Sequence, residues 1–157
     1  MVDHYRMYVS QKCQYALRAI FELSQRLERV PVRTADIAEA QAIPPKFLEL
    51  ILGELRQGGF VESRRGARGG YLLLRRPDRV TVGEVIRFVD GPVAPVRCVT
   101  EAEPTDCRLY SNGGCAFIGM WRRARDAGNE VFDGTTFQDL IDEDPSSAGQ
   151  CVADYCI

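Results

Sequence analysis

The chain has 157 residues, 45% hydrophobic and 27% charged, a composition that suits one globular domain and excludes collagen-like, disordered and multidomain chains. It has no apolar run of the ~20 residues that a membrane-spanning helix needs and no signal-peptide core, so we expect a soluble cytoplasmic protein with no membrane partner. Lys and Arg outnumber Asp and Glu by 16 to 11 in residues 1–97, whereas the ratio is 4 to 11 in residues 98–157, so that the front half suits a polyanion such as double-stranded DNA.

Three helical patterns come first along the chain. Apolar residues recur at three- and four-residue steps up to Leu27, after Ser10, which is placed to cap that helix. Thr34 is the expected cap of a short second helix that ends at Ala40. A third helix is predicted over 44–57, from two prolines to two glycines. Only a brief turn separates the second helix from the third, which predicts a helix-turn-helix.

Two short strands are predicted over 60–63 and 71–74. The loop between them, 65–70, is rich in arginine and glycine, and its glycines permit positive backbone φ. Thr81 and Glu84 then form a capping box for a further helix. A helix-turn-helix followed directly by a basic hairpin is the arrangement of a winged helix.

The back half begins with a stretch, 92–114, in which no helical or strand period survives, and we expect an ordered loop there. Thr136 with Asp139 resembles a capping box for a last short helix. Between loop and last helix, apolar and small residues step by four, three, four and three, which is typical of a helix that packs against another. These residues are Phe117, Trp121, Ala124, Gly128 and Val131. A second subunit is the expected occupant of that face.

The expected fold class is therefore mainly α with a small β-hairpin, in which a winged helix-turn-helix is followed by a long dimerisation helix. The predicted parts are a DNA-binding domain over 1–90, a cysteine-bearing sensor loop over 91–116, the dimerisation helix and short terminal helix over 117–143, and a tail over 144–157.

The candidate DNA-binding residues lie on the third helix and the hairpin. They are Lys46, Phe47, Glu49, Arg64, Arg65 and Arg68. Lys46 can meet phosphate or guanine, and Glu49 can accept a hydrogen bond from a cytosine amino group in the major groove. The hairpin arginines can enter the minor groove, where the potential is more negative. A solubilising turn is the alternative interpretation of these arginines.

The sequence resembles the bacterial winged-helix transcriptional regulators that include the iron-sulfur cluster regulator IscR, the nitric-oxide sensor NsrR, the rhizobial iron regulator RirA and the cysteine-metabolism regulator CymR. The likeness is carried by Ser-Gln-Lys-Cys-Gln-Tyr-Ala-Leu-Arg over 10–18, by Arg-Gly-Ala-Arg-Gly-Gly-Tyr-Leu over 65–72 and by Val-Gly-Glu-Val-Ile over 82–86, and it extends to about Leu140. It implies a homodimer, a palindromic operator and a base-reading position for Glu49.

Cys98, Cys107 and Cys115 are the candidate metal ligands. Eight residues separate the first two and seven the last two, a spacing that fits no short zinc pattern and leaves one coordination site unfilled. The resemblance implies that they hold an iron-sulfur cluster, expected to be [2Fe-2S], because the sensing relatives place three cysteines in this loop.

The fourth ligand stays unassigned. Relatives use a histidine three residues after the third cysteine or an acid from the first helix, but Ile118 and Gln14 stand at those positions. Cys13 is a candidate, although its place on the apolar face favours a buried core thiol. Cys151 and Cys156 are open as ligands, a redox pair or neither.

The expected function is a dimeric, sequence-specific DNA-binding regulator, a repressor, that senses iron-sulfur, redox or nitric-oxide status. A cluster-free regulator of the same family, controlled by its thiols or by a partner protein, is the alternative. A redox or metal enzyme is disfavoured because the chain has no Cys-x-x-Cys, no phosphate loop and one histidine, His4, so we expect no catalysis and no small-molecule substrate.

Overall fold

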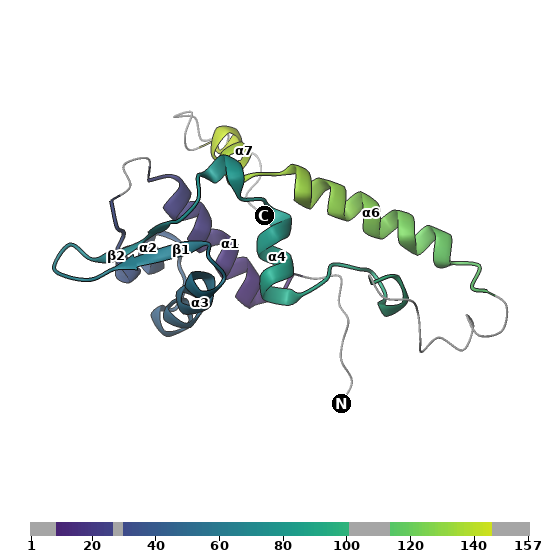
Figure 1. The fold of residues 1–157 in the computed structure, drawn as a ribbon, viewed down its shortest axis with the longest axis horizontal. Coiled ribbons are helices and arrows are strands. Elements are labelled where there is room, and N and C mark those ends of the chain that lie inside the picture. Colours follow the sequence, from purple (N-terminus) through teal and green to yellow (C-terminus); the bar gives the residue numbers. More distant parts are fainter. Residues whose placement is uncertain (1–8, 27–29, 101–113, 146–157) are drawn as a thin grey trace.

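The computed structural model describes residues 9–26, 30–100 and 114–145. Its elements, with η for a turn of 3-10 helix, are α1 (Gln11–Ser24), α2 (Thr34–Ala40), α3 (Pro45–Gln57), β1 (Val61–Arg64), β2 (Gly70–Leu73), η1 (Pro77–Arg79), α4 (Val82–Asp90), η2 (Arg97–Val99), α6 (Ile118–Gly134) and α7 (Phe137–Glu143). The mainly α class with one antiparallel hairpin is confirmed. The hairpin projects at one end and α6 extends toward the other (Figure 1).

Several expectations fall outside this part of the chain. They concern His4, Cys107, Cys151 and Cys156, together with most of the predicted tail. Within the described ranges, no helix is both long and apolar enough to span a membrane.

The core is built around α1. Ser10 caps this helix as predicted, because its side-chain oxygen accepts a hydrogen bond of 3.1 Å from the backbone N–H of Cys13. The helix ends at Ser24, before the expected Leu27. Its buried face joins one apolar cluster with α2, α3, β1 and α7, and that cluster includes Ile20, Leu23, Ile37, Leu48, Ile51, Leu52, Leu55, Val61 and Phe137. The last helix therefore closes over the first.

The helix-turn-helix comprises α2 and α3 and the turn between them. A buried carboxylate, Glu22 of α1, accepts a 2.9 Å hydrogen bond from Gln41 in this turn and pairs with Arg26 at 2.7 Å. The expected cap of α2 is wrong: Thr34 is already helical, and the cap position falls on Arg33, the last residue with an extended backbone. No side chain caps α2 there.

The hairpin is confirmed, with each strand shifted by one residue from the prediction. Val61 pairs with Leu73 and Arg64 with Gly70. The segment before α2 adds a third partner, because the backbones of Val32 and Tyr71 exchange two hydrogen bonds of 2.8 Å. A Cβ on Gly70 would lie 2.3 Å from the Val32 carbonyl oxygen, so only glycine permits this approach.

The back half is attached to the winged helix through α4. Both predicted capping boxes are present, at Thr81 of α4 and Thr136 of α7. Arg87 of α4 pairs with Asp133 of α6 at 2.5 Å. Backbone hydrogen bonds from Val82 to the Thr135 carbonyl and from Phe137 to the Val80 carbonyl complete the junction. The end of α6 is thus fixed to the winged helix.

Candidate functional site

The candidate recognition helix, α3, buries one face and exposes the other. Its buried residues are Leu48, Ile51, Leu52 and Leu55. The predicted DNA-binding residues Lys46, Phe47 and Glu49 are all exposed, and Phe47 keeps 60% of its surface accessible. A 2.6 Å ion pair between Lys12 and Glu54 ties the helix to α1. The exposed side chains are therefore presented on a helix that the core holds rigidly.

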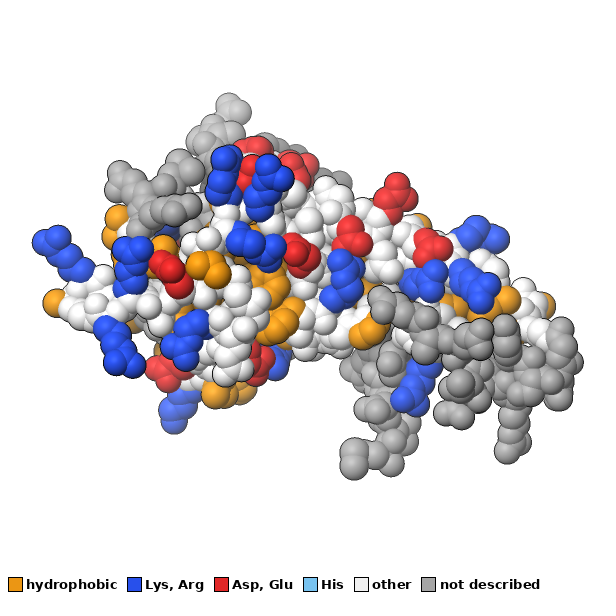
Figure 2. All heavy atoms as spheres, viewed as in Figure 1, with side chains coloured by type: hydrophobic (Ala, Val, Ile, Leu, Met, Phe, Trp, Pro, Cys, Tyr) orange, Lys and Arg blue, Asp and Glu red, His pale blue; other side chains and the backbone are white. Residues whose placement is uncertain are grey.

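The hairpin presents three exposed arginines. Arg64 pairs with Glu62 across 3.2 Å, whereas Arg65 and Arg68 take part in none of the ion pairs among the described residues. Figure 2 shows lysine and arginine side chains around the end of the molecule where Figure 1 places the hairpin. The two tip arginines can therefore take up phosphate without first losing a carboxylate partner.

The tight turn of the hairpin depends on glycine. A Cβ on Gly69 would lie 2.4 Å from the Arg64 carbonyl oxygen, and Gly66 has φ of +109°, a region that favours glycine. The amide of Gly69 donates to the Gly66 carbonyl at 2.9 Å. This geometry places Arg65 and Arg68 at the tip, where sequence reasoning expected them.

The described part of the cysteine loop lies against α6. Cys98 belongs to η2 and Cys115 precedes α6, and both thiols are free and half-buried. The guanidinium of Arg125 in α6 donates a 2.7 Å hydrogen bond to the carbonyl of Val99, whose side chain is buried. The two described cysteines therefore flank the first half of α6, and Cys107 lies outside the described residues.

Cys13 has the environment of a core thiol. Its side chain is fully buried, and desolvation, followed by the nearby carboxylate of Asp90, raises the pKa of the thiol to about 12. Because a metal ligand must be a thiolate, this site disfavours Cys13 as the fourth ligand. Among the described residues, no three His, Cys, Asp or Glu side chains are grouped closely enough to hold a metal ion.

Sequence reasoning missed a contact that joins the start of α1 to the end of α4. The carboxylate of Asp90 accepts hydrogen bonds from the backbone N–H of Ser10 at 2.7 Å and from its hydroxyl at 2.5 Å. The two residues are 80 positions apart, so no local period could reveal the pair. Ser10 thus caps α1 and anchors α4 at the same time.

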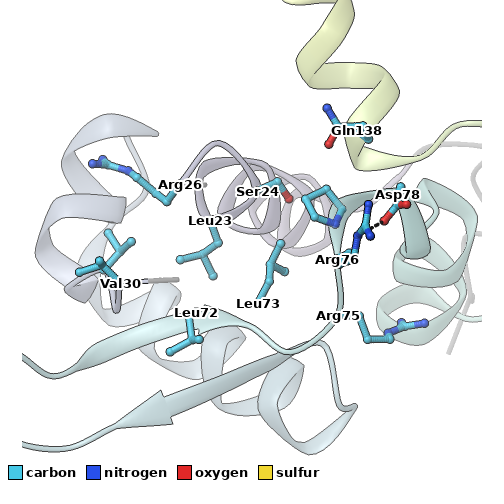
Figure 3. A pocket seen from close by; sticks show the side chains of 12 residues that line it. Leu23, Ser24, Arg26, Val30, Leu72, Leu73, Arg75, Arg76, Asp78 and Gln138 are labelled. Carbon is cyan, nitrogen blue, oxygen red and sulfur yellow. Dashed lines mark ion pairs between the residues drawn. The ribbon is translucent and has the colours of Figure 1, made fainter. Parts of the chain in front are cut away.

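A pocket of about 240 Å³ opens between α1, the hairpin and α7. Figure 3 shows its apolar wall, formed by Leu23, Leu72 and Leu73, together with three arginines. The arginines are Arg26, Arg75 and Arg76, and each already pairs with a carboxylate: Glu22, Glu84 and Asp78, respectively. The volume is below that of typical small-molecule sites, and the paired charges leave it poorly suited to an anion.

The outer face of α6 carries apolar side chains that the described chain does not cover. No residue of α6 is buried. Phe117, Met120 and Val131 keep 62%, 40% and 64% of their surfaces exposed. Two of these belong to the predicted seam, and Figure 2 shows apolar side chains at the outer end of the helix. This stripe is a candidate interface.

Comparison with known proteins gives concordant matches over most of the chain. Residues 9–143 match the Rrf2 family, described as iron-dependent transcriptional regulators. The HTH-type transcriptional regulator CymR of Bacillus subtilis is 37% identical over 134 residues, which cover 85% of this chain and 89% of that protein.

Two solved structures have a fold similar to that of this chain. The structure of CymR, the global cysteine regulator of B. subtilis, has a TM-score of 0.71 at 33% identity and covers 92% of this chain and 98% of its own. The structure of T. potens IscR also has a TM-score of 0.71, at 30% identity, with 94% and 96% covered.

Proposed function

The chain belongs to the Rrf2 family of DNA-binding transcriptional regulators, and from this premise we propose that it is a dimeric, sequence-specific regulator, acting as a repressor, whose cysteine loop carries an iron-sulfur sensor. The observation that carries the proposal is the position of this loop. Its described part, around Cys98 and Val99, lies against the long helix with the exposed apolar stripe, and that helix is fixed to the winged helix.

The DNA-binding part of the proposal rests on α3 and the hairpin. Lys46 and Glu49 are exposed on a helix of the right type to enter the major groove, and Arg65 and Arg68 form a basic tip suited to the minor groove or to phosphate. Residues 1–90 act as the DNA-binding domain. Phe47 adds an apolar surface beside these polar groups.

The dimeric part rests on the uncovered face of α6. An apolar stripe on a helix that buries none of its own residues suits a second copy of the same helix, in a two-fold arrangement. Two recognition helices related in this way read half-sites about 34 Å apart, or a multiple of that distance, on a palindromic operator. Residues 117–143 are the dimerisation part.

The cluster part rests on the chemistry of the loop. Cys98 and Cys115 are free, half-buried thiols that remain accessible to a metal centre, and thiolates are the usual ligands of iron-sulfur clusters. With Cys107 they would supply three ligands, within a sensor loop over 91–116. A bound cluster, in our proposal [2Fe-2S], would supply a centre that reacts with oxidants or nitric oxide.

A chain of contacts connects the described part of the cysteine loop, through α6, to the DNA-binding half. Arg125 holds the Val99 carbonyl, and eight residues later on the same helix Asp133 pairs with Arg87 of α4. A loop that becomes ordered or loosened changes the position of α6, and with it the distance between the two recognition helices. For a nearly complete switch, the two states must differ in operator affinity by about 5.5 kcal/mol.

The test is anaerobic purification followed by visible spectroscopy on the wild type and on Cys98→Ala, Cys107→Ala and Cys115→Ala. We expect a brown wild-type protein, loss of its visible bands in all three variants, and a change of operator affinity when the bands are bleached. Cys13→Ala is the matched control and should keep the bands. A wild type that stays colourless after reconstitution with iron and sulfide would end the cluster proposal.

A cluster-free regulator controlled by its thiols or by a partner protein is the second candidate. Two observations favour it: the likeness to CymR extends over most of both chains, and Cys13, the candidate fourth ligand, is a fully buried thiol whose pKa is raised to about 12. It predicts a colourless protein whose operator binding is weakened by oxidation and restored by dithiothreitol. Unchanged operator binding under oxidation would exclude control by the thiols and leave control by a partner protein as the remaining form of this candidate.

A further inference from the structure

The exposed side of α3 carries a continuous stripe at four-, three- and four-residue steps. Its members are Lys46, Leu50, Gly53 and Gln57. These positions lie opposite the buried leucines and isoleucine of the helix, since residues three and four apart share a face. Leu50 keeps 68% of its surface exposed, more than any other large hydrophobic residue that the structure describes.

Gly53 stands one turn after Leu50 and is not required by the fold. A mid-helix glycine weakens a helix relative to alanine. A Cβ built on Gly53 meets nothing within 4 Å, and its backbone is ordinary helix, whereas a Cβ on Gly58 would meet the Phe88 ring at 2.5 Å. The missing side chain therefore leaves room for something that approaches the helix from outside.

The surroundings of Leu50 point to the nature of that partner. Lys46 lies one turn before it and Glu49 directly beside it, so the leucine is an apolar island among the polar groups proposed to read bases. Phe47, three residues earlier, is also exposed. In the major groove the C5-methyl of thymine is the apolar group that distinguishes one base from the others.

We infer that Leu50 contacts the C5-methyl group of a thymine in each operator half-site, and that Gly53 lets the backbone of α3 lie close to the duplex beside that contact. The inference rests on the proposed DNA-binding function and specifies it. Leu50 would then be an apolar base contact beside the polar base contacts proposed for Lys46 and Glu49. Such a contact lets the protein distinguish a thymine from a base that offers the same hydrogen-bonding groups but no methyl group.

The first test uses full-length wild-type protein and needs no variant. An operator is selected from genomic fragments, and each thymine of a half-site is replaced in turn by deoxyuridine, which lacks only the methyl group. We expect affinity to fall about fourfold at the thymine that meets Leu50, as for one buried methyl group, and to stay unchanged at flanking thymines. Equal binding to every deoxyuridine operator would overturn the inference and leave the proposed function standing.

The second test assigns the contact to Leu50. Leu50→Ala should bind the thymine operator about fourfold more weakly and should no longer distinguish thymine from deoxyuridine at that position. Leu74→Ala removes an equally apolar side chain, 50% exposed, outside α3, and should keep the full preference. A Leu50→Ala protein that folds by circular dichroism and still prefers thymine would remove Leu50 from the contact.

The third test addresses Gly53. Gly53→Ala should raise the urea midpoint of unfolding, since alanine favours the helix, and should weaken operator binding about tenfold because the added methyl meets the DNA. Improved stability with unchanged operator affinity would contradict the close approach. Failure of the wild type to select any operator would instead contradict the proposed function itself.

Discussion

The two ends of this chain differ in how much of their apolar surface the chain itself buries. In the winged helix, α1, α3 and the hairpin bury their apolar faces in one cluster, and most buried apolar residues of the described chain lie between Cys13 and Ile86. α6 spans 17 residues and buries none of them. In proteins, most helical stability comes from packing of an apolar face against other parts of the structure. The winged helix therefore buries its apolar faces within one chain, whereas α6 keeps an apolar face that the described chain does not cover.

The largest expected effect comes from the uncovered stripe of α6. Val131→Asp places a charge on this face and should convert a dimer to a monomer, with operator affinity lower by about 100-fold or more because the two half-sites are no longer bound together. Sedimentation velocity and a binding titration measure both. The control is Arg123→Asp, an exposed position outside the predicted seam of the same helix, and this variant should remain dimeric. If Val131→Asp also stays dimeric, the uncovered face of α6 is not the dimer interface.

The second effect tests the completeness of the winged helix. Gly70→Ala places a Cβ against the Val32 carbonyl and should lower the free energy of unfolding by about 2 kcal/mol. Urea denaturation followed by circular dichroism measures it. Gly66→Ala shares a positive φ but meets nothing within 4 Å, so it should cost less. Equal losses would show that packing against Val32 contributes little.

The third effect concerns base reading. Glu49→Ala should weaken binding to the selected operator by about 1.5 kcal/mol, roughly tenfold, and relax the preference at one base pair only. Competition binding with operators changed at each position measures this. Loss of affinity that is uniform across all sequences would move Glu49 out of base contact and into general positioning of the helix.

A smaller effect is expected at the hairpin tip. Arg65→Ala and Arg68→Ala should each lower affinity for any duplex by about 1 kcal/mol and flatten the slope of log affinity against log salt by about one unit. Arg122→Ala removes the same charge from α6 and should leave the slope unchanged. An unaltered slope in both hairpin variants would favour the solubilising interpretation of these arginines.

The smallest effect is a pH dependence at the start of α4. Partial burial alone would raise the pKa of Glu84, but hydrogen bonds from the Thr81 backbone and the Arg75 guanidinium outweigh it and hold the pKa below its ordinary value of 4.5. A depressed folded-state pKa stabilises the fold above the ordinary value, and this contribution is lost as pH falls through the folded-state pKa.

Glu84→Gln keeps a side-chain acceptor for the Thr81 N–H and removes the charge. The acid side of its stability profile should be shallower than that of the wild type, by less than about 1 kcal/mol because Glu84 is partly solvated. Urea midpoints measured between pH 3 and pH 7, in roughly unit steps, check this. Parallel profiles would show that the ion pair with Arg75 adds nothing.

Local signals in the sequence predicted the local features of the fold. The caps at Ser10, Thr81 and Thr136, and the end of α6 at Gly134, each follow from a few neighbouring residues, and all are present. The prediction for α2 was wrong by one residue, because Arg33 and not Thr34 takes the cap position.

Long-range contacts were not predictable in this way. The pairs Val32 with Tyr71, Ser10 with Asp90 and Arg125 with Val99 join residues between 26 and 80 positions apart. No hydrophobic period encodes them, because each depends on how helices pack. For the candidate site, sequence reasoning found the exposed charges of α3 and the hairpin but assigned no role to Leu50 or Gly53, whose meaning depends on the degree of exposure and on empty space around the backbone.

The most direct test of the central claim is a binding selection of genomic fragments by the full-length protein, followed by footprinting of the retained fragments and measurement of the protein-to-DNA ratio. The account predicts a palindromic site protected over two half-sites about one helical turn apart, or a multiple of that, and occupied by two protomers. No fragment retained above non-specific background, under reducing or oxidising conditions, would contradict it.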